Sequence, residues 1–140
     1  MDHNLQLLGL AKKAALLAVG GDDTSASARN GKAVLILSAK DASDGSKRRA
    51  RESARGAGVM YLEVPYSMDD LGTVSGKGSP GTIAFLEPGL AAGFLAGLAK
   101  RAPEIYKEPA EQFAQMVRNN NSWSGKDNYR RSVNRGRTVK

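Results

Sequence analysis

The sequence contains no cysteine and a single histidine, His3. Without cysteine the chain can form no disulfide, no thiolate zinc site and no cysteine nucleophile. With one histidine close to the N-terminus, a histidine-based metal site and a Ser-His-Asp triad are nearly excluded. The composition therefore favours a protein that is not an enzyme and that holds neither a metal nor a cofactor. It also suits a reducing compartment, and we expect a cytoplasmic location.

The sequence also lacks an uninterrupted apolar run that could cross a membrane. The apolar stretch at residues 5–19 is broken by Lys12 and Lys13, and no basic segment precedes it. This pattern is neither that of a signal peptide nor that of a membrane span. We therefore expect no membrane partner.

Acidic residues are scarce at one end of the chain. The 140 residues carry a net charge of +7, from 21 basic and 14 acidic side chains. Residues 117–140 hold seven of the basic residues and only one acidic residue, Asp127, which leaves 14 basic and 13 acidic residues in the body. A basic tail on a nearly neutral body is typical of a protein that binds a polyanion.

Residues 33–44 are the stretch around which the chain is organised. They begin with an unbroken apolar run rich in β-branched residues, which predicts a strand covered on both faces. The run ends in Asp41, Ser43 and Asp44, whose short acceptor side chains suit the start of a helix. A central strand that leads into a helix predicts a layered α/β fold.

Apolar periodicity predicts the elements around this strand. A wide apolar stripe at residues 4–17, with Leu7, Leu10, Ala14 and Leu17 at helical spacing, predicts a core-facing helix that Gly20 and Gly21 end. Further helices are expected at residues 22–30, 43–57 and 68–71 and from Pro88 onward, and further strands at residues 59–64 and 82–86.

A last helical segment is expected to begin at Pro103 and to be interrupted near Pro109. Its apolar residues Phe113, Met116 and Val117 could dock it on the body. We divide the chain into an α/β domain at residues 1–101, a helical extension at 102–118 and a basic tail at 119–140. The tail lacks periodicity and is expected to be disordered unless it meets a partner.

The helix expected at residues 43–57 is unusually basic. Its only apolar face is made of alanines, and the basic residues that crowd the rest are Lys47, Arg48, Arg49, Arg51 and Arg55. A solvated helix face is one interpretation. A secondary surface that contacts phosphates is the other.

Two acidic pairs and one glycine-rich loop resemble catalytic motifs only superficially. The loop at residues 72–78 has glycines spaced one residue too closely for a phosphate-binding loop, and Gly78 stands where a magnesium-binding hydroxyl would be needed. The adjacent carboxylates at residues 22–23 and 69–70 are better explained by the positive N-termini of helices. No catalytic constellation is therefore predicted.

Aromatic residues are interleaved with basic ones in the tail. The tail residues that we expect to contact RNA are Trp123, Lys126, Tyr129, Arg130, Arg131, Arg135 and Arg137. Aromatic rings can stack on bases while arginines pair with phosphates, although a merely solubilising tail is the alternative.

Several motifs, taken in order, resemble one family. The segment 7–14 (LLGLAKKA) matches its first helix, and the segment 29–43 (RNGKAVLILSAKDAS) matches the end of its second helix, its central strand and the loop that follows. Val64-Pro65 and the segment 71–76 (LGTVSG) match a further signature. Residues 4–100 thus resemble the L-seven-Ae/L-thirty-e family of kink-turn-binding ribosomal proteins, particularly its small bacterial members.

The resemblance implies a three-layer α/β/α sandwich around a mixed sheet, and RNA binding at two places. The first is the N-terminus of the second helix, which in the family reads sheared G·A pairs and here consists of Gly20, Gly21, Asp22 and Asp23. The second is the loop before the last strand, which covers bulged nucleotides and here consists of Lys77, Gly78, Ser79 and Pro80. Lys40, after the central strand, joins this predicted RNA-binding set.

The chain departs from the family at the second helix. Family members carry Asn or Lys followed by Glu or Gln where this chain has Asp22 and Asp23, and Lys one turn later where it has Ala26. An ionised aspartate accepts hydrogen bonds but cannot donate them. It could therefore accept a hydrogen bond from a guanine amino or imino group, but it would repel phosphate.

The first hypothesis is a non-enzymatic protein that binds a structured, kink-turn-like ribosomal or other noncoding RNA, alone or with other ribonucleoprotein components. A protein-interaction module on the same fold is the second. A methyltransferase accessory domain is the third, and it would need a cofactor-binding partner because this chain contains no such domain.

Overall fold

The central apolar stretch forms the most deeply buried strand of the sheet. In the computed structural model, which describes residues 2–119, β2 (Leu35–Ser38) is buried at all four positions. It pairs in parallel with β3 (Met60–Glu63) and antiparallel with β4 (Thr82–Phe85), and β4 pairs antiparallel with β1 (Leu17–Val19). The sheet is therefore mixed and open, with the order β1-β4-β2-β3.

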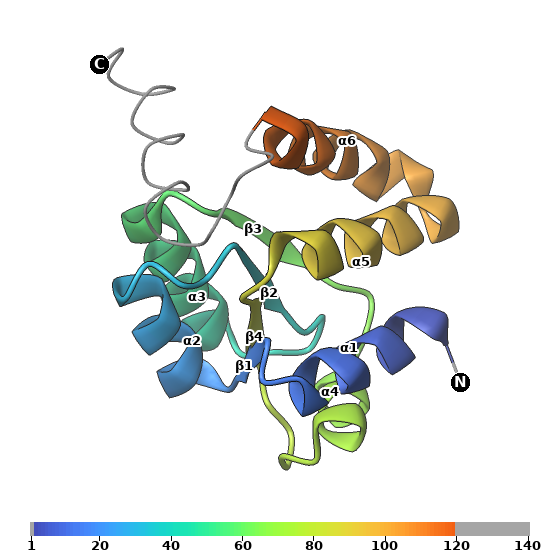
Figure 1. Cartoon of the computed structure of the whole chain (residues 1–140). Helices are drawn as coiled ribbons and strands as arrows, with labels where there is room; N and C mark the ends of the chain where they lie inside the picture. Colours follow the sequence, from blue (N-terminus) through green and yellow to red (C-terminus); the bar gives the residue numbers. More distant parts are fainter. Residues whose placement is uncertain (1, 120–140) are drawn as a thin grey trace.

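Six helices in the described part of the chain surround this sheet. They are α1 (His3–Lys13), α2 (Gly21–Arg29), α3 (Asp44–Ala57), α4 (Met68–Ser75), α5 (Pro88–Arg101) and α6 (Pro103–Asn119). Figure 1 shows α2 and α3 on one face of the sheet and α1, α4 and α5 on the other, with α6 lying on α5. The predicted α/β class and mixed sheet are confirmed.

Side-chain size sets how closely each layer approaches the sheet. On the side of α2 and α3, the buried contacts are mainly alanines, namely Ala28, Ala50, Ala54 and Ala84, together with Ile36. Small side chains let these helices lie close to the strands. The alanine face predicted for the helix at residues 43–57 is confirmed, and its Ser43 cap accepts a hydrogen bond from the Ser46 amide.

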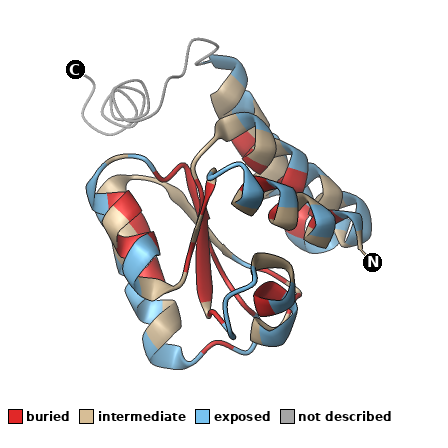
Figure 2. Cartoon of the chain, turned by 60° about the horizontal axis from the view of Figure 1, so that its bottom comes forward, coloured by how far each residue is buried: buried red, intermediate tan, exposed pale blue. Residues whose placement is uncertain are grey.

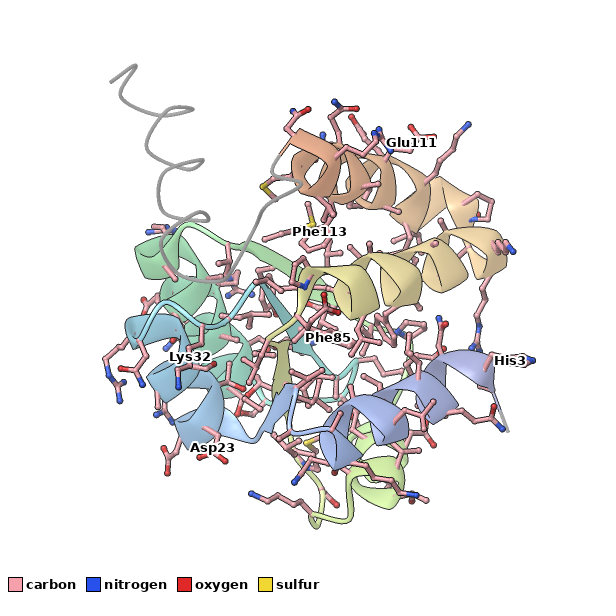
Figure 3. The ribbon with its side chains drawn as sticks, in the orientation of Figure 1. His3, Asp23, Lys32, Phe85, Glu111 and Phe113 are labelled. Carbon is pink, nitrogen blue, oxygen red and sulfur yellow. The ribbon has the colours of Figure 1, made fainter. Side chains whose placement is uncertain are left out.

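The opposite layer contains the large apolar side chains. Phe85 of β4 and Phe94 of α5 are fully buried, with ring centroids 5.3 Å apart. Figure 2 shows buried strands between the helical layers, although β3 at the edge of the sheet has no fully buried residue. Phe113, which is also fully buried, points from α6 toward the body, whereas Glu111 points outward (Figure 3). The predicted docking of the last helix through its apolar residues agrees with this arrangement.

The first helix is shorter than its sequence pattern predicts. It ends at Lys13, Ala15 takes a positive φ of 62°, and the chain then forms β1 rather than a continued helix. Leu10 is 62% exposed, while Leu8 and Ala11 are buried in its place. The expected helix over residues 4–17 was wrong at its C-terminal end because a short apolar strand after an apolar helix leaves no break in the hydrophobic pattern.

Two later elements also differ from the prediction. The fourth helix runs over eight residues, from Met68 to Ser75, rather than over residues 68–71. The last helix continues through Pro109 without the expected interruption. Proline removes one backbone hydrogen bond, but buried Tyr106 and Phe113 anchor the helix on either side of it.

The N-terminus of α1 is fastened to α5 and to the segment after β3. Asp2 caps α1 by accepting a hydrogen bond from the Asn4 amide at 2.7 Å. Its carboxylate also accepts a hydrogen bond from the Tyr66 hydroxyl at 3.0 Å and pairs with the Arg101 guanidinium, which lies over the Tyr66 ring. This cluster holds three separate segments together at the edge of the large apolar core.

Candidate nucleic-acid interface

The turn between β1 and α2 exposes main-chain atoms rather than a side chain. Gly20 takes a φ of +98°, which L residues rarely adopt, and nothing lies within 4 Å of the position where a Cβ would stand. Its own amide donates to the Thr82 carbonyl at 2.9 Å. No side chain caps α2, so the amides of its first turn face outward without a partner from the described side chains. The turn therefore offers an open, positively polarised helix end.

The loop between α4 and β4 is shaped by glycine. Gly76 ends α4 in the left-handed conformation, and Gly78 has a φ of +36° with open space around it. Lys77, Gly78 and Ser79 are exposed, whereas Pro80 is buried. The Ser79 hydroxyl donates to the Asp69 carboxylate at 3.0 Å, which ties the loop to the start of α4. Of the four predicted loop residues, Pro80 is therefore the one turned away from the surface.

These two segments, which lie far apart in the sequence, meet in the structure. The Lys77 Nζ lies 3.5 Å from the Asp23 carboxylate, and both side chains are more than half exposed. The two RNA-contacting places that the family resemblance implied are therefore adjacent and form one continuous surface, which we call the α2–loop surface (residues 20–23 and 76–79).

The other aspartate of this surface pairs with α3. The Arg49 guanidinium donates to the Asp22 carboxylate at 2.9 Å, and both side chains are exposed. Each aspartate is thus accompanied by a cation from another element. Exposed ion pairs contribute only about 0.2–1 kcal/mol, so a ligand can rearrange them at little cost. Sequence reasoning did not assign Arg49 to this place, because nothing in the sequence shows which turn of α3 lies beside α2.

Lys40, the remaining predicted RNA contact in the described part of the chain, lies in the loop between β2 and α3. The preceding residue, Ala39, donates its amide to the Gly81 carbonyl at 2.8 Å, so the β2–α3 loop runs beside the end of the α4–β4 loop. Lys40 is exposed, and its carbonyl accepts a hydrogen bond from Lys47. The Lys40 amide itself donates to the Tyr66 carbonyl at 2.9 Å, so none of these hydrogen bonds joins Lys40 to the α2–loop surface.

A small hollow of about 50 Å³ lies behind this surface, between α2, α3 and the start of β4. It is lined by Gly21, Thr24, Ser25, Ser46, Arg49, Ala50, Gly81 and Thr82. The Thr24 and Thr82 hydroxyls are buried and have no hydrogen-bond partner in the described part of the chain. A polar space of this size can hold water, which would satisfy them.

In residues 2–119, no three side chains of the kinds that ligate metals gather in a cluster, and no helix combines the length and the hydrophobicity that a membrane span requires. The predicted tail contacts, namely Trp123, Lys126, Tyr129, Arg130, Arg131, Arg135 and Arg137, lie outside the described residues.

No protein-family model matches the sequence, and no curated protein sequence matches it. Solved structures do share the fold. A protein of unknown function from Bacillus halodurans C matches with a TM-score of 0.63 and 23% identity, over 70% of this chain and 98% of that chain. The Giardia lamblia 15.5kD RNA binding protein matches with a TM-score of 0.53 and 19% identity, over 69% of this chain and 82% of that chain. At these identities the likeness establishes a common fold.

Proposed function

We propose that this chain is a non-enzymatic RNA-binding protein that recognises a kink-turn-like RNA, ribosomal or otherwise noncoding, in the cytoplasm. The observation that carries the proposal is the contact between Lys77 and Asp23, which joins the α2 N-terminus and the α4–β4 loop into one exposed surface. The Giardia lamblia protein that shares this fold is named for RNA binding. The family resemblance at residues 4–100 assigns RNA contacts to these same two segments.

The surface has the chemistry to read a bent RNA. Asp22 and Asp23 can accept hydrogen bonds from the imino and amino groups of guanine, which sheared G·A pairs expose. Lys77 and Arg49 place cations beside those carboxylates and offset their repulsion of phosphate. The open backbone at Gly20 and Gly78 lets nucleotides approach closely. The family's lysine is replaced by Ala26, and in this proposal the cations come from α3 and the loop instead.

A pair of RNA probes tests the proposal. One is a 20-base-pair duplex, and the other is the same duplex interrupted by a three-nucleotide bulge and tandem G·A pairs. The full chain should bind the kinked RNA more tightly than the plain duplex. Substituting both carboxylates, Asp22→Ala with Asp23→Ala, should weaken kinked-RNA binding by about 1–3 kcal/mol for each base that the variant no longer recognises, with a smaller effect on the duplex.

Lys77→Gln separates the effect of the loop from general electrostatics. This variant should weaken kinked-RNA binding, whereas Lys107→Gln, which removes the same charge from exposed α6, should not. Equal affinity of the wild type for both RNAs would contradict recognition of the kink. Tighter binding of both RNAs by the double aspartate variant would mean that the carboxylates only repel phosphate. If these variants lost a protein partner while their RNA binding stayed unchanged, the protein-interaction module would be favoured.

A further inference from the structure

Helix α3 carries an excess of positive charge on its outward side. Its 14 residues include five basic side chains and two acidic ones, Asp44 and Glu52. Only Ala50 and Ala54 are buried, because the helix contacts the sheet and α2 through a narrow alanine face. Most of the circumference of α3 is therefore available to a partner.

Two of the five basic side chains form ion pairs within the protein. Lys47 pairs with Glu63 at 3.3 Å, and Arg49 pairs with Asp22 at 2.9 Å. In the described part of the chain, no carboxylate lies within 4.0 Å of Arg48, Arg51 or Arg55, and all three are exposed. We call these three residues the arginine stripe.

The arginine stripe has a regular geometry. Positions 48, 51 and 55 are spaced by three and four residues, so they lie on one side of the helix and extend over about 10 Å of its axis. Arg51 lies over the ring of Tyr61, 5.9 Å from its centroid, which steadies the middle of the stripe. Guanidinium groups in such a row can each face a successive phosphate of a nucleic-acid backbone.

The charge pattern of α3 is unfavourable for an isolated helix. Lys47 and Arg51, and then Arg51 and Arg55, stand four residues apart, where like charges repel. Glu52, four residues after Arg48 and three before Arg55, offsets part of this repulsion. The opposite end of the molecule differs, since α6 carries Glu104, Glu108 and Glu111 and its labelled Glu111 points outward (Figure 3). A polyanion along α3 would relieve the repulsion that the fold leaves in place.

From these observations we infer that the arginine stripe of α3 is a second RNA surface, which holds the phosphate backbone of a duplex. The helix that carries the stripe also borders the α2–loop surface, because Arg49 of α3 pairs with Asp22 at the start of α2. The choice of RNA over other polyanions rests on the proposed function. A stem that leaves the α2–loop surface would then continue along α3.

The salt dependence of binding to the plain 20-base-pair RNA duplex tests this inference. The full-chain variant Arg48→Gln/Arg51→Gln/Arg55→Gln removes three charges at nearly unchanged helix propensity. Each phosphate contact contributes about 0.9 to the slope of log affinity against log salt. The wild type should therefore lose about 40-fold more affinity than the variant between 50 and 200 mM salt.

A matched variant controls for net charge. Lys13→Gln/Lys100→Gln/Lys107→Gln removes three exposed charges from α1, α5 and α6, and it should keep the slope of the wild type. Circular dichroism of both variants tests whether they remain folded. An unchanged slope in the arginine variant, or an equal change in both variants, would overturn the inference. If kinked-RNA binding depended on Lys77 but not on the arginine stripe, the inference would also be overturned, while the proposed function would remain.

Discussion

Gly72 is the residue whose lack of a side chain fixes the α4–β4 loop against α4. A Cβ at this position would lie 1.6 Å from the Gly78 carbonyl oxygen and 2.7 Å from its carbon. Because Cβ atoms essentially never come within 3.0 Å of such atoms, Gly72→Ala must move the loop by at least about 1.4 Å. The loop carries Lys77, so the same movement must disturb its contact with Asp23.

The magnitude follows from two opposing effects. Alanine is favoured over glycine inside a helix by about 1 kcal/mol, but overpacking against rigid backbone costs about 1–3 kcal/mol or more. The clash here is with main chain, which yields less readily than a flexible side chain, so the upper part of that range applies. After the gain in helix propensity is subtracted from the cost of the clash, we expect Gly72→Ala to lower the free energy of unfolding by about 1–2 kcal/mol and to weaken binding of the kinked RNA.

Gly93→Ala is the matched control for this prediction. Gly93 also lies inside a helix, α5, but nothing stands within 4 Å of its Cβ position. This variant should raise the free energy of unfolding by about 0.5–1 kcal/mol and leave RNA binding unchanged. Urea denaturation of the two variants gives the comparison. A Gly72→Ala protein as stable as Gly93→Ala would refute the placement of the loop against α4.

Three further predictions concern other parts of the chain. Burial alone would raise the pKa of the Asp2 carboxyl. Hydrogen bonds from the Asn4 amide and the Tyr66 hydroxyl, together with the charge of Arg101, lower it by more, so the pKa lies below its ordinary value of 3.8. Asp2→Asn should therefore be less stable than the wild type at pH 7 in thermal denaturation, and the difference should shrink as the pH falls below about 4; a constant difference would contradict this. Phe113→Ala should cost about 3–5 kcal/mol in urea denaturation, whereas an effect near zero would show that α6 docks only loosely. Removing residues 120–140 should reduce the salt slope of RNA binding, and an unchanged slope would mean that these residues contact no phosphate.

The parts of the fold that the sequence predicts are those with strong local signals. The apolar run before Asp41 predicts a covered strand, which the structure confirms, and Ser43 caps the next helix as its position indicates. Glu87 and Pro88 likewise mark the start of α5, where the Glu87 carboxylate accepts hydrogen bonds from two amides. These elements were predictable because each depends on neighbouring residues alone.

The parts that were missed depend on contacts between distant segments. The short strand at Leu17–Val19 exists because it pairs with β4, and its three residues carry no signal that separates them from the preceding helix. The pairing of Arg49 with Asp22 depends on how α3 lies beside α2. The positive φ of Gly78 also emerges only in the structure, and it means that a side chain at this position would strain the loop itself.

The most direct test of RNA recognition is a titration of the full chain with the kinked RNA, followed by NMR of its backbone amides. We predict that the amides of residues 20–23 and 76–79 shift first and most, with those of α3 following when the stem is lengthened. Shifts confined to α5 and α6, or no shift at the α2–loop surface at saturating RNA, would contradict the claim that this surface recognises RNA.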